Sequence, residues 1–345
     1  MLKNYPGPVL AKLLLLGLCA APAMAEKTDV VVLINGNAVT GEVKSLEFGK
    51  LKYSTDSMGT VSIDWEDIVS VSSQQYHQVE LPDGTRHYGQ LIPTSEPHTV
   101  RIVTASDEYI YRTAEIVRIT PIEANAGFIE RLDGSFSFGI QTQKASEVTT
   151  SNLAADVSYR QRRYLLGLRL SSAITDQPNE PTTARQSTNL NYQRFRSNRW
   201  FTEWFTGWEK NDELGIQGRS SIGGALGRYL LQTNKNQFSV TAGVQGARSS
   251  YIGAEDSTTE AEGRIELRYL HRSLSPETSF RITGTIYPLL EDLSRYRAES
   301  DMSLRRELLD DLFLELSIGY SYLSDPTEGA ASSDYTATTS IGYSF

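Results

Sequence analysis

The sequence predicts an all-β protein: a transmembrane antiparallel β-barrel of about 12 strands, preceded by two small β-repeats. Three observations support this prediction. From Phe128 onward, segments of about ten residues alternate apolar and polar side chains, the period of a wall that meets lipid on one face and water on the other. Residues 30–122 contain an internal duplication. The chain ends in a strand-like segment whose last residue, Phe345, is aromatic.

Residues 1–25 have the features of a secretory signal peptide. Leu13–Leu18 form an apolar core, and Ala23–Ala25 provide a small-residue cleavage site. The one cysteine of the chain, Cys19, lies within this segment. We therefore expect an exported mature chain with neither disulfides nor thiolate chemistry.

The charge balance argues against nucleic-acid binding. The chain has 345 residues and a formal net charge of -9, and no basic cluster in the sequence is dense enough to track phosphates. After residue 25 no apolar run approaches the roughly 20 residues that a membrane helix needs. If the mature chain spans a bilayer, it must therefore do so with β-strands whose apolar and polar residues alternate.

The duplication aligns two hairpin turns and two closing strands. Residues 33–36 (Leu-Ile-Asn-Gly) match residues 81–84 (Leu-Pro-Asp-Gly), and residues 67–71 match residues 115–119. The Asn-Gly and Asp-Gly pairs favour the positive backbone angles of tight turns. Each repeat is thus predicted to form a small bent antiparallel sheet of about four or five strands.

We expect the repeats to form modules over residues 26–76 and 77–124. Their pattern resembles Sm-like and SH3-like small barrels, a resemblance that implies binding of RNA or peptides. The acidic residues Asp64, Glu66 and Asp67 argue against RNA. The favoured interpretation is a structural or protein-docking pair of β-modules, and the alternative is a binder of a periplasmic protein or polymer.

The four histidines offer two candidate sites. His77, His87 and His98 match no metal-binding spacing, so we expect no metal and no cofactor. His271 and Ser273 resemble the His-Ser pair of an outer-membrane lipid A deacylase. We place this pair in a turn, and no orienting acid lies at a suitable spacing. We therefore predict no catalytic residues.

The barrel is expected over residues 125–345. Short turns at 160–162, 197–198 and 233–236 largely alternate with longer polar links at 144–150, 173–186, 209–215, 248–259 and 324–334. Bacterial outer-membrane barrels alternate short periplasmic turns with long outer loops. We therefore expect the N-terminal repeats and the C-terminus on the periplasmic side. The alternative fold is a soluble sandwich of two stacked sheets.

Aromatic side chains gather near the ends of the expected strands. Tyr and Trp suit the headgroup level of a bilayer because each ring has an apolar body and a polar end. The candidate girdle residues are Tyr159, Tyr164, Trp200, Trp208, Tyr229, Tyr269, Tyr287, Tyr296, Tyr322 and Tyr335.

The face opposite the apolar one has charges of both signs. The predicted lumen network comprises Glu262, Arg264, Glu266, Arg268, Arg297, Glu299, Asp301 and Arg305. Opposite charges in a narrow lumen are expected to pair and fill it. An open ion pore would show an excess of one sign at a constriction. We therefore predict a plugged or narrow barrel.

The final strand places Ile341, Tyr343 and Phe345 on one face. This pattern resembles the C-terminal signal by which the barrel assembly machinery recognises bacterial outer-membrane barrels. The order of export signal, β-module and barrel resembles the YdiY-like family, also described as salt-induced outer-membrane proteins and classed as a domain of unknown function. That resemblance covers residues 128–345 and implies no catalytic residues.

These features together predict a non-enzymatic outer-membrane β-barrel of a Gram-negative bacterium, with a periplasmic β-module and a structural or stress-related envelope role. The alternatives are a narrow outer-membrane channel and a lipid-modifying enzyme. The expected partners are outer-membrane lipid, the barrel assembly machinery through the C-terminal strand, and a periplasmic protein or polymer through the N-terminal module. Nucleic acid is not an expected partner.

Overall fold

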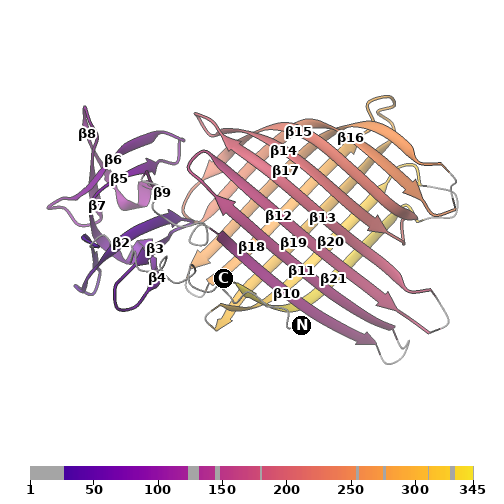
Figure 1. Cartoon of the computed structure of the whole chain (residues 1–345), viewed down its shortest axis with the longest axis horizontal. Helices are drawn as coiled ribbons and strands as arrows, with labels where there is room; N and C mark the ends of the chain where they lie inside the picture. Colours follow the sequence, from indigo (N-terminus) through magenta and orange to yellow (C-terminus); the bar gives the residue numbers. More distant parts are fainter. Residues whose placement is uncertain are drawn as a thin grey trace, which may run out of the picture.

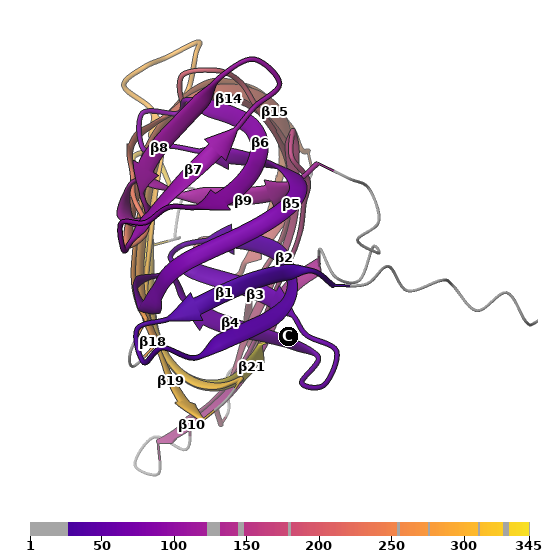
Figure 2. The same ribbon diagram turned by 90° about the vertical axis from the view of Figure 1, so that its left-hand side faces the viewer.

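Two β-structures follow one another along the chain, an N-terminal sheet and a closed barrel (Figure 1). The computed structural model describes residues 27–122, 132–143, 148–178, 181–253, 256–274, 277–309, 311–326 and 331–344. The predicted signal peptide, residues 1–25, lies outside the described residues. The N-terminal sheet lies at one end of the barrel and extends across its mouth (Figure 2).

Twelve antiparallel strands close the barrel in sequence order, as predicted. They are β10 (Leu132–Gln143), β11 (Val148–Arg160), β12 (Tyr164–Asp176), β13 (Thr183–Phe195), β14 (Trp200–Asn211), β15 (Ile216–Gln232), β16 (Asn236–Tyr251), β17 (Thr258–Leu274), β18 (Glu277–Pro288), β19 (Tyr296–Leu309), β20 (Leu312–Leu323) and β21 (Ser333–Ser344). β10 pairs with β21 from Ser135↔Ser344 to Phe138↔Ile341. This closure rules out the alternative of two stacked sheets.

The wall alternates as the sequence predicts, with apolar side chains outside. On β10, Phe136 and Phe138 are 46% and 47% exposed, whereas the intervening Ser135 and Ser137 are 8% and 6% exposed. Ile222 on β15 is 70% exposed. The barrel is therefore the inverse of a water-soluble protein, with its apolar surface outside and its polar groups within.

Two of the predicted girdle aromatics face inward instead. Tyr229 is buried against Phe201, with ring centroids 4.8 Å apart. The hydroxyl of Tyr287 donates to Glu299 inside the barrel, at 3.3 Å. Their positions near strand ends are compatible with either face, and strand parity places both side chains on the lumen side.

The N-terminal sheet has nine strands in the order β4-β3-β2-β1-β5-β6-β7-β8, and β9 pairs with both β2 and β5. The elements are β1 (Asp29–Leu33), β2 (Ala38–Glu47), β3 (Lys50–Ser54), β4 (Thr60–Asp64), η1 (Trp65–Asp67), β5 (Ile68–Glu80), β6 (Arg86–Pro93), β7 (Thr99–Val103), β8 (Glu108–Arg112), η2 (Thr113–Glu115) and β9 (Arg118–Pro121). Gly36 and Gly84 have φ values of 82° and 85°, which confirms the two predicted turns. Among the described residues, no helix has the length and apolarity needed to span a bilayer.

The closing strand of each repeat pairs with its own repeat and also contacts the other repeat. The first half of β5 pairs with β1 of its own repeat, at Val31↔Val71, and its end reaches β6 of the second repeat, at Ser73↔Leu91. In the second repeat, β9 pairs with the later half of β5 and also reaches back to β2, at Leu46↔Ile119. β5 therefore crosses the predicted module boundary at residues 76/77, and both repeats share one buried core. The Sm-like or SH3-like resemblance stays a prediction.

Glycines allow aromatic rings to lie flat against the inner wall of the barrel. Phe201 and Gly227 are cross-strand partners, as are Phe313 and Gly342. A Cβ at either glycine would lie 2.2 Å from the ring Cζ of its partner. Each ring covers the backbone that the glycine leaves bare, an arrangement known to stabilise glycines in sheets.

We predict that Gly227→Val destabilises the barrel by about 1–3 kcal/mol, because the added side chain must displace the buried ring of Phe201. The measurement is the urea midpoint for loss of the compact, heat-modifiable band on gels. Gly246→Val is the matched control, since nothing lies within 4 Å of a Cβ at that position. Equal midpoints for the two variants would contradict the prediction.

Candidate functional site: the charged lumen and its covered mouth

The predicted lumen residues come from β17 and β19 and lie on the inner face of the wall. Ile265 and Leu267 are exposed outside, whereas Glu262, Arg264 and Glu266 between and beside them are buried. Buried charges require partners because an unpaired ion in a narrow interior is strongly destabilising. The lumen therefore contains an ion-pair belt, formed by Glu203, Glu209, Arg219, Glu262, Arg264, Glu266, Arg268, Arg297 and Glu299.

Glu266 is the centre of one half of the belt. Its carboxylate accepts from Arg264 at 2.5 Å and from Arg268 at 2.6 Å. Arg264 also pairs with Glu203 at 3.6 Å and lies over the ring of Phe205, with 4.2 Å from Cζ to the centroid. A single carboxylate thus holds two guanidinium groups from its own strand, and Arg264 connects β17 to β14 across the lumen.

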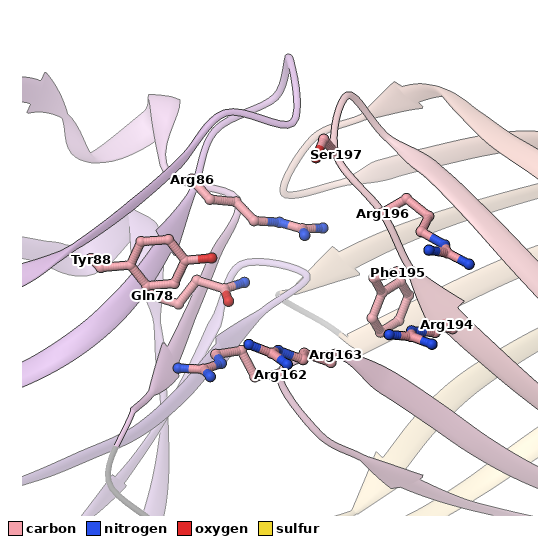
Figure 3. A pocket seen from close by; sticks show the side chains of 9 residues that line it. All are labelled: Gln78, Arg86, Tyr88, Arg162, Arg163, Arg194, Phe195, Arg196 and Ser197. Atoms are coloured by element: carbon pink, nitrogen blue, oxygen red, sulfur yellow. The ribbon is translucent and has the colours of Figure 1, made fainter.

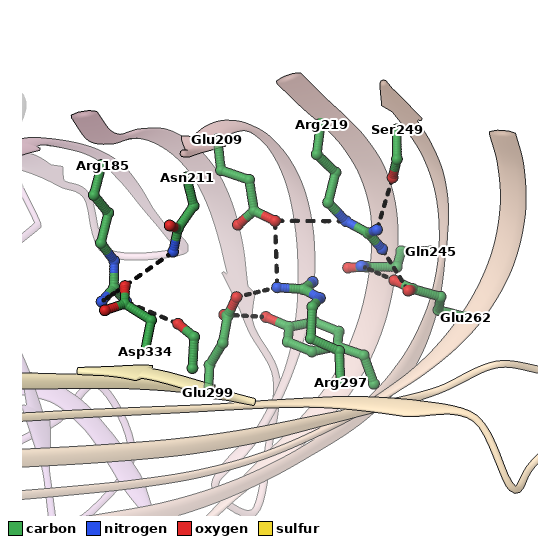
Figure 4. Close-up of polar contacts among 12 residues, drawn as sticks. Arg185, Glu209, Asn211, Arg219, Gln245, Ser249, Glu262, Arg297, Glu299 and Asp334 are labelled. Atoms are coloured by element: carbon green, nitrogen blue, oxygen red, sulfur yellow. Dashed lines mark hydrogen bonds and ion pairs between the residues drawn. The ribbon is translucent and has the colours of Figure 1, made fainter. Parts of the chain in front are cut away.

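Glu209 is the centre of the other half (Figure 4). It lies 3.5 Å from Arg297 and 3.7 Å from Arg219. Arg297 also pairs with Glu299, and Arg219 pairs with Glu262. Ion pairs consequently link β14, β15, β17 and β19 around the interior.

Neutral side chains complete this half of the belt. Gln245 donates to Glu262 at 2.7 Å, and Arg219 donates to the hydroxyl of Ser249 at 2.8 Å (Figure 4). Beside the belt, Arg185 pairs with Asp334 at 3.3 Å, and Asn211 donates a hydrogen bond to the same carboxylate at 3.2 Å (Figure 4). Polar contacts thus extend over a large part of the inner wall.

The structure extends the predicted network and leaves two of its predicted members, Arg305 and Asp301, outside the belt. Arg305 pairs with Glu315 of β20 at 2.8 Å, apart from the belt. Asp301 is exposed and forms no ion pair within the described part of the chain. Glu209 and Arg185 were expected in links, but β14 and β13 include them. Strand parity counted onward from Glu203 is the signal that finds Glu209.

The N-terminal sheet contacts the barrel at the end that holds the turns 161–163, 196–199 and 233–235, called here the covered mouth. Arg160 of β11 pairs with Glu47 at 2.9 Å, and Lys235 pairs with Glu66 at 3.0 Å. Lys50 pairs with Glu277 of β18. Salt bridges from three separate barrel strands or turns therefore hold the sheet across this mouth.

A buried charge cluster lies behind the contact with Arg160. Arg118 pairs with Glu80 at 3.0 Å and with Glu47 at 3.3 Å. Burial alone would raise the pKa of both carboxyls, but the guanidinium groups of Arg160 and Arg118 outweigh it at Glu47, and those of Arg118 and Arg86 outweigh it at Glu80. The pKa of each glutamate consequently lies below its ordinary value.

An aromatic layer lies inside the barrel next to the covered mouth. Phe195, Phe201 and Tyr229 pack together there, and Leu165 packs against them. Gln193 donates to the hydroxyl of Tyr229 at 2.9 Å, and Arg160 lies over the ring of Phe195 at 4.6 Å. From the covered mouth inward, the lumen contains an aromatic layer and then the ion-pair belt.

The candidate catalytic pair does not lie in the predicted turn. β17 continues to Leu274, so His271 and Ser273 are both strand residues. Nδ1 of His271 is hydrogen-bonded to the amide oxygen of Asn236 at 2.8 Å, and among the described residues no carboxylate contacts this ring. The orienting acid that a triad requires is therefore not found at this position.

The other three histidines contact separate groups. His77 is buried with Nδ1 at 2.9 Å from the carbonyl of Gln75. Nε2 of His87 lies 2.9 Å from the hydroxyl of Tyr111, and Nδ1 of His98 lies 3.1 Å from the carbonyl of Ile68. Within the described ranges, no group of three or more His, Cys, Asp or Glu residues is arranged to hold a metal ion.

The last strand presents its aromatic face to the outside. Ile341 and Tyr343 of β21 are 55% and 52% exposed. Phe345, the third residue of the predicted assembly signal, lies outside the described residues. β21 ends at the same end of the barrel as the N-terminal sheet (Figure 1).

Solved structures with similar folds are bacterial barrels. The NanC porin structure covers 62% of this chain and 98% of its own, at 14% identity and a TM-score of 0.39. The translocator domain of the autotransporter NalP from Neisseria meningitidis covers 62% and 87%, at 11% identity and a TM-score of 0.35. The beta domain of the Bordetella autotransporter BrkA covers 62% and 97%, at 14% identity and a TM-score of 0.32. No curated protein matches the sequence.

A family model matches most of the barrel. Its description is "Protein of unknown function, DUF481", and the match extends over residues 136–345, more than half of the chain. The N-terminal sheet lies before the matched region. The narrower YdiY-like assignment stays a prediction. The chain therefore belongs to the DUF481 family.

Proposed function

We propose that the chain is a non-enzymatic outer-membrane β-barrel protein of the Gram-negative envelope, with the N-terminal sheet in the periplasm. The observation that supports this most directly is the apolar exterior of the closed wall. Trp204 and Ile222 are 63% and 70% exposed there. Each Å² of such surface kept from water is worth about 25 cal/mol, so a lipid environment is strongly favoured over solution.

The turn lengths support the periplasmic placement of the N-terminal sheet. The turns at the covered mouth are short, whereas the links at the opposite end, such as 252–257, 289–295 and 324–332, are longer. Bacterial barrels have short periplasmic turns and longer outer loops. Recognition by the assembly machinery through β21, and a periplasmic protein or polymer as partner of the sheet, belong to the same proposal.

The lumen supports a structural envelope role over that of a general channel. The ion-pair belt has charges of both signs, and most of its members are buried. An aromatic layer lies between the belt and the covered mouth, and the N-terminal sheet extends across that mouth. A solute that moved through the belt would have to break buried ion pairs, and breaking one such pair costs about 3–5 kcal/mol.

A narrow channel is the second candidate, and one observation favours it. Asp156 and Arg169 pair at 2.9 Å inside the barrel, yet their side chains remain 42% and 51% exposed. This side of the lumen, next to β11 and β12, is therefore less tightly filled than the belt side. Conductance distinguishes the two candidates.

Orientation in the membrane provides the first prediction. We expect the chain in the outer-membrane fraction, with heat-modifiable migration on gels. The one cysteine lies in the predicted signal peptide, so single-cysteine variants of the mature chain give clean labelling. A membrane-impermeant maleimide should label Ser257→Cys in intact cells, but Asn35→Cys only after permeabilisation. The reverse labelling pattern would refute the periplasmic placement of the sheet.

Planar bilayers provide the second prediction. We expect no discrete openings from the reconstituted wild type, because the belt, the aromatic layer and the N-terminal sheet together obstruct the path through the barrel. The double variant Arg219→Ala, Glu262→Ala removes both members of a buried pair, so it should introduce measurable conductance steps. Arg248→Ala is the control, because Arg248 is exposed and contacts Ser257 outside the belt. Discrete openings from the wild type would favour the channel instead.

Acid sensitivity of the covered mouth provides the third prediction. The pKa values of Glu47 and Glu80 are lowered in the fold, so their stabilising effect is complete above their ordinary value of 4.5 and is lost as pH falls through the depressed values. Pepsin should therefore cleave the N-terminal sheet of the detergent-solubilised protein faster at about pH 3 than at about pH 5, with each rate divided by the rate for an unfolded substrate at the same pH.

Variants separate this effect from general acid damage. Glu47→Gln, Glu80→Gln should weaken the sheet at about pH 5 and flatten the pH dependence of cleavage. The exposed Glu96→Gln, which breaks no ion pair among the described residues, serves as the matched control and should retain the wild-type profile. A double variant with the wild-type pH profile would show that these carboxylates are not responsible.

A further inference from the structure

An arginine-lined cleft separates the N-terminal sheet from the barrel turns that face it (Figure 3). Its volume is about 460 Å³. Five arginines line it: Arg86 of β6, Arg162 and Arg163 of the β11–β12 turn, Arg194 of β13, and Arg196 of the β13–β14 turn. We call this site the arginine cleft.

Among the described residues, four of the five arginines in the cleft form no ion pair. Arg86 pairs with Glu80 at 3.2 Å. Arg162 lies over the ring of Tyr88, 6.0 Å from Cζ to the centroid, and no carboxylate is among the described residues that line the cleft. The whole chain has a net charge of -9, so this accumulation opposes the average. Clustered guanidinium groups repel one another unless an anion lies between them.

Arg194 and Arg163, on the barrel side of the cleft, lie next to aromatic residues of the outer face of the wall. Leu190 and Tyr192 of β13 are exposed on the outside, and Arg194 is the next residue of the same parity. Arg163 precedes Tyr164, whose ring lies 5.6 Å from that of Tyr192. Aromatic rings mark the interfacial level of a bilayer. The arginines therefore lie at the level of the lipid phosphates.

The chemistry of the lining matches a phosphodiester. A guanidinium group presents a planar fork of donors that binds two phosphate oxygens at once. Gln78, Tyr88 and Ser197 add an amide and two hydroxyls that can donate to further oxygens. Two separate parts of the protein, the sheet and the barrel turns, contribute these donors. A phosphate in the cleft would consequently join the sheet to the barrel.

We propose that the arginine cleft binds the phosphodiester headgroup of an anionic glycerophospholipid. This inference rests on the proposed function, because the cleft meets such a headgroup only when the wall spans a membrane with the sheet on the phospholipid side. Lipid is favoured over a soluble phosphate because Arg194 and Arg196 continue the outer, apolar face of β13.

The test uses the full mature chain, reconstituted in nanodiscs of phosphatidylcholine that contain increasing phosphatidylglycerol, or titrated in detergent with short-chain phosphatidylglycerol. We expect saturable binding of the anionic lipid by native mass spectrometry. Arg163→Gln, Arg194→Gln should weaken it at least tenfold. The control, Arg112→Gln, Arg248→Gln, loses the same charge away from the cleft and should stay within twofold of wild type. Equal loss in both double variants would overturn the proposal.

A competition experiment identifies the source of the phosphate. Inorganic phosphate at about 10 mM, a large excess over the lipid, should leave lipid binding unchanged. If inorganic phosphate displaced the lipid from the cleft, the lipid assignment would be overturned in favour of a soluble anion. If the double variant fails to insert, the single variant Arg163→Gln, which changes one exposed turn residue, should still weaken lipid binding.

Failure of the inference differs from failure of the proposed function. A protein that shows heat modifiability and outer-membrane fractionation, yet binds phosphatidylglycerol no better than phosphatidylcholine, retains the barrel function and loses only the lipid site. A protein that never enters the membrane fraction fails the proposed function itself, and the lipid site fails with it.

Discussion

Closure of the wall between β10 and β21 is the constraint on which the rest of the structure depends. Lipid offers no hydrogen-bond partner, so every backbone group of a membrane wall must pair with a neighbouring strand. The register from Ser135↔Ser344 to Phe138↔Ile341 completes that pairing. Once the wall is closed, alternate side chains must point inward, and charged ones such as Glu266 and Arg297 are buried there. The ion-pair belt follows, because each buried charge needs a partner of the opposite sign.

Strand number and the two faces of the wall were predictable because a period of two is a local property of the sequence. The pairing of the charges could not be predicted from the sequence, because Glu209 and Arg297 are brought together only by the curvature of the whole barrel. The duplicated turns were equally visible, yet β5 runs through the expected boundary at residues 76/77. Alternation shows that a strand exists and not which neighbours it pairs with. His271 was misplaced for a related reason, because polar residues at a strand end look like a turn.

The arginine cleft shows a second limit of sequence analysis. Arg162-Arg163 and Arg194-Phe195-Arg196 are short basic groups about thirty residues apart, which is the length of a β-hairpin in this wall. Neither stands out in a chain with a net charge of -9. Antiparallel register brings their turns to the same end of the barrel, and the N-terminal sheet adds Arg86 from the other side. The conclusion that nothing basic is clustered therefore holds along the chain but not in space.

The strand pairs between the two repeats make each half of the N-terminal sheet dependent on the other. A single repeat by itself would leave the edge at Leu46 without the partner that Ile119 now provides. The pairs Leu46↔Ile119 and Ser73↔Leu91 show that each repeat completes an edge of the other. We therefore expect neither half of the sheet to fold when it is separated from the other.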